Sequence, residues 1–472
     1  MEQSKRNTIY LRNAVLLALV NILLRGAAVS FNGYVSGKIG AESMGLFTLV
    51  MSIYGFAVTL ATSSVHLAAV RLTAERCARL AEAHADRPSY RRTVRHILWA
   101  VCGYSMLFGG GAAVLLFGFS KGIALHLLHD LRTLSSLRIL AVSLPAISLT
   151  SALNGYFTGM RKVGKNAVTT LLEQAAKFCI TATALVCAAP TGNVEYMCLA
   201  VVGGSAGAEA LSLVSAGIFT LTDSRIPKGD KPGHEPYTLP TGFRDVSAIA
   251  LPIAVGSYAR QGLVTAEHLA IPWGLKRSGV STQEALTAYG VLQGMALPVI
   301  LFPYAVIGAF TGMLIPEITA LHAVGDHERL RRLAGKALRT AGWFSLVSLV
   351  VFFCFADPLG QRLYHHAEAG VYIRRLAFLV PFMYIDTVTD ALLKGMGEQL
   401  YCMRVNMIDA LCSLVLVVIC TPTLGLTGYV LSMYACEIVN LGMSAWKLWD
   451  KLGCSVVEKK EKISDPIRNQ RS

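Results

Sequence analysis

The chain has 472 residues, of which 54% are apolar and 15% charged, and its mean hydropathy is +0.51. A soluble globule of this length needs more polar surface than this composition supplies, so the sequence predicts an integral membrane protein. The 43 Lys and Arg against 29 Asp and Glu are then read as a guide to membrane orientation, and we expect no nucleic-acid partner.

Apolar runs long enough to cross a bilayer recur along the whole chain. In chain order, the predicted spans are 12–33, 45–70, 97–118, 135–156, 166–187, 196–220, 246–272, 286–312, 338–356, 373–393, 404–421 and 426–447. The first run is followed at once by another, so we expect it to be a membrane span and no signal peptide. The 11 cysteines include no C-x-x-C pair, and we interpret them as small buried apolar residues.

Basic residues alternate between the two sides that these spans define. With both termini in the cytoplasm, the inner segments hold about 31 Lys and Arg and the outer segments about 9. The even number of spans and the orientation support each other. One missed helix would place every later basic segment on the opposite side of the membrane, and the difference between the two sides would be lost. We therefore predict a multi-pass protein of the bacterial cytoplasmic membrane.

Two halves of the chain follow one plan. Leu144-Pro145 and Gly159-Met160 return 236 residues later as Val380-Pro381 and Gly395-Met396, and two isolated cations stand 235 apart in the first span of each half. Because six spans are an even number, duplicated halves have the same orientation, and a site is expected between them. The predicted organisation is an N-terminal lobe 1–220, a cytoplasmic linker 221–245, a C-terminal lobe 246–447 and a basic cytoplasmic tail 448–472.

Ionisable residues inside a membrane usually face water or a partner, because a charge at mid-bilayer costs about 2.5–3.5 kcal/mol. The first span carries one polar stripe, formed by Asn21, Arg25, Asn32 and Ser36. In the seventh span, Arg260 and Glu267 share a face. We predict that Arg25 and Arg260 meet across a cleft and bind an anionic substrate, with Asn21, Asn32 and Glu267 beside them. The alternative is that each arginine pairs with a carboxylate or reaches to an interface.

Other intramembrane charges are candidates for ion or proton coupling. Asp386 and Asp390 lie four residues apart on one face, where two carboxylates raise each other's pKa. Glu173 is a further candidate, although Lys177 stands four residues later, and we favour a structural pair between these two. We expect no cofactor and no metal, with coupling to the membrane potential, H⁺ or Na⁺.

No enzyme signature appears in the sequence: the outer connections hold no Asp-rich cluster, H-E-x-x-H or G-x-S-x-G, and the chain lacks a P-loop. We therefore predict a protein that is not an enzyme. A membrane glycan ligase or polymerase and an assembly scaffold are the less favoured alternatives, as is a major-facilitator transporter.

The segment SALNGYFTGM at residues 151–160, with Glu173-Gln174 after it, resembles the polysaccharide transporter branch of the multidrug/oligosaccharidyl-lipid/polysaccharide (MOP) exporter superfamily. The beginning of the chain, with Arg25-Gly26 and then GAESMGLF at residues 40–47, resembles the first hairpin of the same branch. Within it, the sequence is most similar to the stage V sporulation protein B-like and lipid II flippase-like group.

The resemblance implies an all-α membrane fold with about 12 helices in two parallel six-helix lobes around a central cavity. It implies a flippase that moves a polyprenyl-diphosphate-linked sugar outward by alternating access, for peptidoglycan, spore cortex or another envelope oligosaccharide. Arg25 and Arg260 match the cavity cations of this group. Lipid II flippases have two further C-terminal helices, which the twelve predicted spans do not include. Membrane lipids and envelope-biosynthesis enzymes are the other expected partners. A cation-coupled multidrug antiporter of the same fold remains the alternative.

Overall fold

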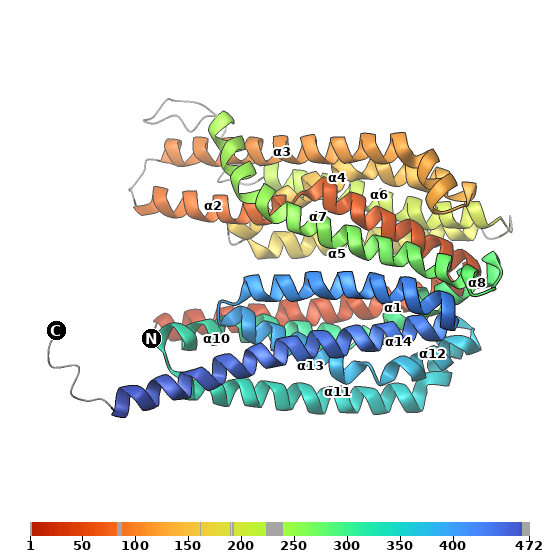
Figure 1. Cartoon of the computed structure of the whole chain (residues 1–472). Coiled ribbons are helices and arrows are strands. Elements are labelled where there is room, and N and C mark those ends of the chain that lie inside the picture. Colours follow the sequence, from red (N-terminus) through yellow and green to blue (C-terminus); the bar gives the residue numbers. More distant parts are fainter. Residues whose placement is uncertain are drawn as a thin grey trace. The chain divides into compact units, whose positions relative to one another are not determined.

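A computed structural model describes residues 2–82, 87–160, 162–188, 190, 193–222 and 239–464, and in this part of the chain the regular elements are all helices. The helices form two compact units (Figure 1). One unit comprises Lys38–Leu269, and the other joins Met1–Gly37 to Ala270–Ser472.

The first helix contributes to both units, and the next eight elements follow it in the unit Lys38–Leu269, except that the end of α7 lies beyond Leu269. Their bounds are α1 Glu2–Thr62, α2 Val65–Glu82, α3 Arg87–Gly122, a π-helical turn Ile123–Leu127, a 3₁₀ turn Leu131–Thr133, α4 Leu134–Gly159, α5 Val163–Ala188, α6 Val194–Leu221 and α7 Leu239–Arg277. Within this unit α4 is central, because it packs against α2, α3 and α6. Its buried face carries Leu144, Tyr156 and Phe157.

The other unit contains the first part of α1 and the helices from α8 onward. Their bounds are α8 Thr282–Tyr289, the π-helix η4 Gly290–Ala296, α9 Leu297–Ile300, α10 Tyr304–Val324, α11 His327–Tyr364, α12 Ala367–Ala377, α13 Val380–Gly395 and α14 Gln399–Ser464. Here α13 is central and packs against α10, α11 and α14.

Eight helical stretches in the described part of the chain are long and apolar enough to cross a membrane, or nine if the bent pair α12 and α13 forms one span. Two of them, Ile22–Arg76 and Gln399–Gly453, are 55 residues long. At 1.5 Å per residue each would reach about 80 Å, more than twice the hydrocarbon thickness of about 30 Å. Each therefore supplies two spans, and the helices are compatible with the twelve predicted from the sequence.

Glycines break both of these long helices at the predicted span boundaries. Gly40 has φ 78° and ψ 169° inside α1, and Gly425 has φ 61° and ψ −144° inside α14. Backbone in this region is almost restricted to glycine, since a Cβ would meet the neighbouring carbonyl. The two glycines therefore let the chain change direction between successive spans.

We expect Gly40→Ala to destabilise the protein, because alanine strains the left-handed backbone at the break. The expected loss is about 1–3 kcal/mol in the free energy of unfolding. Thermal unfolding in detergent would measure it as a lower midpoint. Gly110→Ala is the control, because a Cβ there meets open space within α3. An unchanged midpoint for Gly40→Ala would contradict the assigned backbone geometry.

The eighth predicted span, 286–312, differs from the structure. The chain from Thr282 to Val324 is a broken path of α8, η4, α9 and α10, with Pro298 at the start of α9 and Pro303 capping α10. The predicted inner loop 313–337 is also mostly helical, since only Gly325 and Asp326 separate α10 from α11. The predicted bounds were wrong here because a run of apolar residues marks only the part of a helix that lies in the hydrocarbon layer. The helices themselves continue beyond that part.

Contacts in the two units repeat the internal duplication. A Cβ on Gly159 would lie 2.8 Å from the carbonyl oxygen of Val70 and 2.9 Å from the side chain of Thr73. A Cβ on Gly395, 236 residues later, would lie 2.6 Å from the side chain of Ile318. Each glycine ends a central helix and permits close approach of a neighbouring helix, which carries Thr73-Ala74 in one unit and Thr319-Ala320 in the other.

The predicted lobes 1–220 and 246–447 remain a prediction. The compact units group the chain differently: residues up to Gly37 belong with the C-terminal half, and α7 up to Leu269 belongs with the N-terminal half. Residues 223–238 of the predicted linker and 465–472 of the predicted tail lie outside the described residues. The tail segment begins within α14, which ends at Ser464.

Candidate functional site

The polar stripe of α1 changes character along the helix. Arg25 is exposed and has no hydrogen bond or ion pair within the described part of the chain. Ser36, three turns later, is 1% exposed, and its hydroxyl has no partner in that part. The side chain of Asn21 lies outside the described residues. The guanidinium of Arg25 is thus available to a ligand, whereas the far end of the stripe is packed.

Asn32 ties α1 to the π-helix η4. Its Nδ2 donates to the carbonyl oxygen of Gly294 at 2.9 Å. A π-helical turn has irregular backbone hydrogen bonding and is often found at functional sites. At the next residue, a Cβ on Gly33 would lie 2.7 Å from the carbonyl oxygen of Leu363, so α1 also approaches α11 closely. Asn32 therefore positions the segment that carries Arg25, and a contact between Asn32 and substrate stays a prediction.

Hydrogen bonds on one face of α7 direct Arg260 to the opposite face. The Tyr258 hydroxyl is hydrogen-bonded to the Ser63 hydroxyl, and the Thr265 hydroxyl donates to the carbonyl oxygen of Ser52 at 3.2 Å. Tyr258 and Thr265 are seven residues apart and share a face, and Arg260 is about 200° around the helix from Tyr258. Arg260 is accordingly exposed, with no hydrogen bond or ion pair to any other described residue.

Glu267 is half-buried on the same face of α7 as Arg260, two turns further along. No ion pair joins the two side chains among the described residues, which agrees with a rise of about 10 Å between them. Arg25 belongs to one compact unit and Arg260 to the other. Their meeting at one anion therefore remains a prediction.

A polar cavity of about 290 Å³ lies inside the unit Lys38–Leu269. Its walls come from α2, α4, α5 and α6, and its lining includes His66, Thr150, Ser151, Asn154, Asn166, Glu173, Glu209 and Ser212. The Tyr54 hydroxyl, from α1, donates to Glu209 at 2.8 Å and also meets the Ser143 hydroxyl at 2.6 Å. The cavity is thus a second polar site, separate from the two arginines.

Glu173 and Lys177 do not form the predicted pair. No ion pair joins them among the described residues, and Glu173 instead accepts a hydrogen bond from the Ser212 hydroxyl at 2.7 Å. The i, i+4 rule failed here because α6 packs against α5 and offers Glu173 a closer donor. Glu173 lines the polar cavity and remains a candidate for ion or proton coupling.

Replacing Tyr54 with phenylalanine removes one of the hydrogen-bond donors to Glu209. The loss of a donor to a buried carboxylate costs about 1–3 kcal/mol. We expect Tyr54→Phe to lower the unfolding midpoint by more than Tyr304→Phe, whose hydroxyl makes none of the described hydrogen bonds. If the two variants unfolded at the same temperature, the Tyr54 contact would contribute nothing to stability.

The carboxylates of α13 are each engaged by a different partner. Asn440 donates to Asp386 Oδ2 at 3.1 Å, whereas Asp386 Oδ1 is buried without a partner in the described structure. Asp390 pairs with Lys394 at 2.5 Å. Asp390 is therefore already neutralised, and Asp386 is the better candidate for coupling to an ion.

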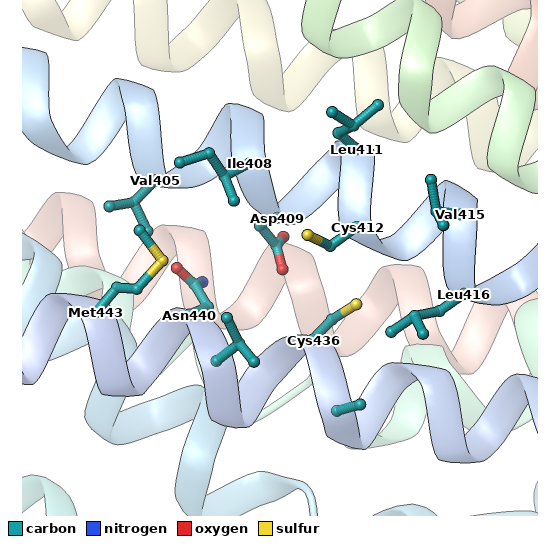
Figure 2. A pocket seen from close by; sticks show the side chains of 12 residues that line it. Val405, Ile408, Asp409, Leu411, Cys412, Val415, Leu416, Cys436, Asn440 and Met443 are labelled. Carbon is teal, nitrogen blue, oxygen red and sulfur yellow. The ribbon is translucent and has the colours of Figure 1, made fainter.

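Asp409 lines a groove of about 320 Å³ between the two parts of α14 that precede and follow the break at Gly425 (Figure 2). The other lining residues named in the figure are mostly apolar, with Asn440 across from Asp409 and the sulfur atoms of Cys412 and Cys436 nearby. Asn440 thus links this groove to Asp386.

Sequence reasoning missed the partners Tyr54, Asn440 and Lys394. Lys394 follows Asp390 by four residues, so helical spacing was a sufficient signal. Tyr54 is 155 residues from Glu209, and Asn440 is 54 residues from Asp386. Nothing local in the sequence connects such distant residues.

Two known families match successive parts of the chain. Residues 10–260 match the family described as Polysaccharide biosynthesis protein, and residues 278–419 match the family described as MatE. The first match covers more than half of the 472 residues, so the chain belongs to the polysaccharide biosynthesis protein family, within the MOP superfamily. The predicted family is confirmed.

Two curated relatives are sporulation proteins of Bacillus subtilis (strain 168). Stage V sporulation protein B is 24% identical over 436 residues, covering 90% of this chain and 80% of the relative. Sporulation protein YkvU is 23% identical over 409 residues, covering 82% and 83% respectively.

Solved transporters have the same fold. An inward-facing multidrug resistance MATE family transporter of the MOP superfamily gives a TM-score of 0.67 at 14% identity, covering 93% of this chain and 98% of that one. A MOP superfamily transporter from Pyrococcus furiosus, titled as having a binding pocket of reverse polarity, gives 0.62 at 14% identity over 93% and 95%. The predicted all-α MATE-like membrane fold is therefore confirmed, and the chain is a multi-pass membrane protein of a transporter superfamily.

Proposed function

We propose that this protein is a flippase that carries a polyprenyl-diphosphate-linked sugar from the inner to the outer leaflet of the bacterial cytoplasmic membrane. The observation that carries the proposal is that Arg25 and Arg260 are both exposed and both unpaired among the described residues. They stand at corresponding places in two halves of a membrane-embedded transporter fold. Such cations need an anionic partner, and the substrate would supply it.

The chemistry of the substrate explains the need for two guanidinium groups. A diphosphate loses its hydration when it crosses about 30 Å of hydrocarbon, and an unpaired ion in that medium is very costly. Guanidinium groups offer bidentate hydrogen bonds that replace the lost water. In the absence of substrate, two such groups would repel each other. Binding of a diphosphate would therefore also remove this electrostatic repulsion.

The membrane potential acts in the direction of export. With a negative cytoplasm, two negative charges that move outward gain about 4.6 kcal/mol per 100 mV, from ~2.3 kcal/mol for each charge. The emptied cavity is then positively charged, and the same field favours its return to the inner side. Transport would therefore need no ATP, and the termini would lie in the cytoplasm as the basic segments predict.

The relatives support an envelope substrate. Two of them are sporulation proteins by name, and the family is described by polysaccharide biosynthesis. A peptidoglycan precursor, of spore cortex or vegetative wall, or another envelope oligosaccharide would fit the proposal. The enzymes that assemble such sugars would then be its natural partners.

Reconstitution with a defined substrate tests the proposal. Proteoliposomes would contain undecaprenyl-diphosphate glycan in the inner leaflet and a membrane-impermeant enzyme that modifies the sugar outside. We expect the protein to make the glycan accessible, with a faster rate under a potential that is negative inside. A zwitterionic phospholipid with a modifiable headgroup is the control cargo. Equal movement of both cargoes, or of neither, would count against the proposal.

A cation-coupled antiporter of the same fold is the second candidate. It is favoured by the unpartnered Oδ1 of Asp386 and by the match of residues 278–419 to the MatE family. An antiporter of cationic drugs should expel a cationic dye against its gradient when Na⁺ or H⁺ is supplied. Dye efflux that is lost in Asp386→Asn, with no movement of glycan lipid, would favour this function.

A further inference from the structure

A third groove lies at the end of the bundle where α11 begins. Its volume is about 420 Å³, within the range of ligand-binding pockets. It lies between the first turns of α11 and the part of α14 from Leu441 to Gly453, with Ile385 and Thr389 of α13 also in its lining. The lining includes Arg331, Gly335, Leu338, Thr389, Leu448 and Trp449. All of them belong to one compact unit.

Arg331 is the charged residue in this lining, and it has no partner within the described structure. Both basic neighbours on α11 are engaged: Arg329 pairs with Asp326 at 3.2 Å, and Arg332 pairs with Glu328 at 3.3 Å. The exposed guanidinium of Arg331 is thus left free for an anion from outside the chain.

The cations of α14 near the groove are also engaged. Lys451 pairs with Glu398 at 2.5 Å, and this contact lowers the pKa of the Glu398 carboxyl group. Lys447 pairs with Asp450 at 3.5 Å. Within the lining of the groove, Arg331 is therefore the guanidinium that has no partner among the described residues, and the charge of a bound anion would lie beside it.

The remaining walls are apolar and open. The Thr389 hydroxyl donates to the carbonyl oxygen of Ile385 at 2.9 Å, so its proton is used within α13 and is not offered to the groove. Trp449 is 81% exposed, and a Cβ on Gly335 would meet open space. Tryptophan is enriched where a membrane meets water, and an apolar channel there suits a hydrocarbon chain.

The groove joins two segments that the basic-residue distribution places on the inner side, 313–337 and the tail from 448. The inner leaflet is rich in anionic lipids, and basic pockets between helices on this side bind their headgroups. A free Arg331 beside an apolar channel matches a molecule with one phosphate and a hydrocarbon chain.

We propose that the groove between α11 and α14 binds an anionic membrane phospholipid, with its phosphate on Arg331 and one acyl chain along Leu338, Leu448 and Trp449. The site is independent of the transported substrate and requires only that the chain lies in a membrane. The bound lipid would hold α11 and α14 together at the inner surface.

Trp449 provides a direct probe. The protein would be reconstituted into vesicles with increasing fractions of phosphatidylglycerol or phosphatidylcholine carrying dibrominated chains, which quench tryptophan on contact. The difference between wild type and Trp449→Phe isolates this residue among the 5 tryptophans. We expect half-quenching at an about tenfold lower fraction of phosphatidylglycerol, because a hydrogen-bonded charge contributes about 1.5–3 kcal/mol.

Matched variants separate a defined site from general surface attraction. Arg331→Gln should remove the preference for phosphatidylglycerol, whereas Lys336→Gln, with the same charge change outside the groove lining, should keep it. Gly335→Phe should fill the channel and reduce the quenching of Trp449 by both lipids, and Gly312→Phe on α10 should not. Equal quenching by the two lipids in wild type, or equal effects of Arg331→Gln and Lys336→Gln, would overturn the proposal.

Discussion

Replacing Arg25 or Arg260 with glutamine should lower the initial rate of glycan-lipid movement by about ten- to a hundredfold. Each guanidinium would form charge-assisted hydrogen bonds to the diphosphate, which contribute about 1.5–3 kcal/mol apiece. Neither side chain has a partner among the described residues, so its removal leaves no buried carboxylate unpaired and should not unfold the protein. The protection assay in proteoliposomes measures the rate, and circular dichroism measures the folding.

Three controls define what the arginines do. Arg25→Lys keeps the charge and loses the bidentate geometry, so an intermediate rate is expected. Lys38→Gln removes one charge from the same helix, near the Gly40 break, and should leave the rate unchanged. A rate that Arg25→Gln and Arg260→Gln leave unaltered would mean that the substrate does not bind these groups.

Valine at Gly159 or at Gly395 should destabilise the protein strongly and to a similar extent. The added side chain would meet the Val70 carbonyl oxygen in one unit and the Ile318 side chain in the other, at 2.8 and 2.6 Å from its Cβ. Overpacking of this kind typically costs about 1–3 kcal/mol. The measurement is the unfolding midpoint of each variant in detergent.

Gly217→Val in α6 and Gly312→Val in α10 are the matched controls, because a Cβ at either position meets open space. They should unfold at or slightly above the wild-type temperature, since valine is a better helix former than glycine. A large loss at Gly159 with none at Gly395 would contradict the equivalence of the two close approaches.

The helical membrane fold could be predicted because its signal is local and long. A run of about twenty apolar residues clearly predicts a membrane span. The Gly-Met repeat at an offset of 236 picked out Gly159 and Gly395, and the structure has a close helix contact at each of them. The π-helix η4 and the short loop at Gly325 left no such signal, because composition does not record where a helix is broken.

The site was predictable only in part. Arg25 and Arg260 could be singled out because isolated charges in apolar helices are rare and need a reason. Both are exposed and unpaired among the described residues, and their binding of one anion stays a prediction. The Glu173 and Lys177 pairing failed, because Ser212 from a neighbouring helix provides the hydrogen bond to Glu173. Tertiary neighbours decide which carboxylate is engaged, and a single sequence does not identify them.

A double-mutant cycle on Arg25 and Arg260 tests most directly whether they hold one anion. Initial rates would be measured for wild type, Arg25→Gln, Arg260→Gln and the double variant with the same diphosphate-linked glycan. If two groups bind one ligand, the effects of their substitutions should be coupled by about 0.5–3 kcal/mol. The rise in activation free energy of the double variant would then be smaller than the sum of the rises in the two single variants. Strict additivity, within about 0.3–0.5 kcal/mol, would mean that the arginines act at separate places.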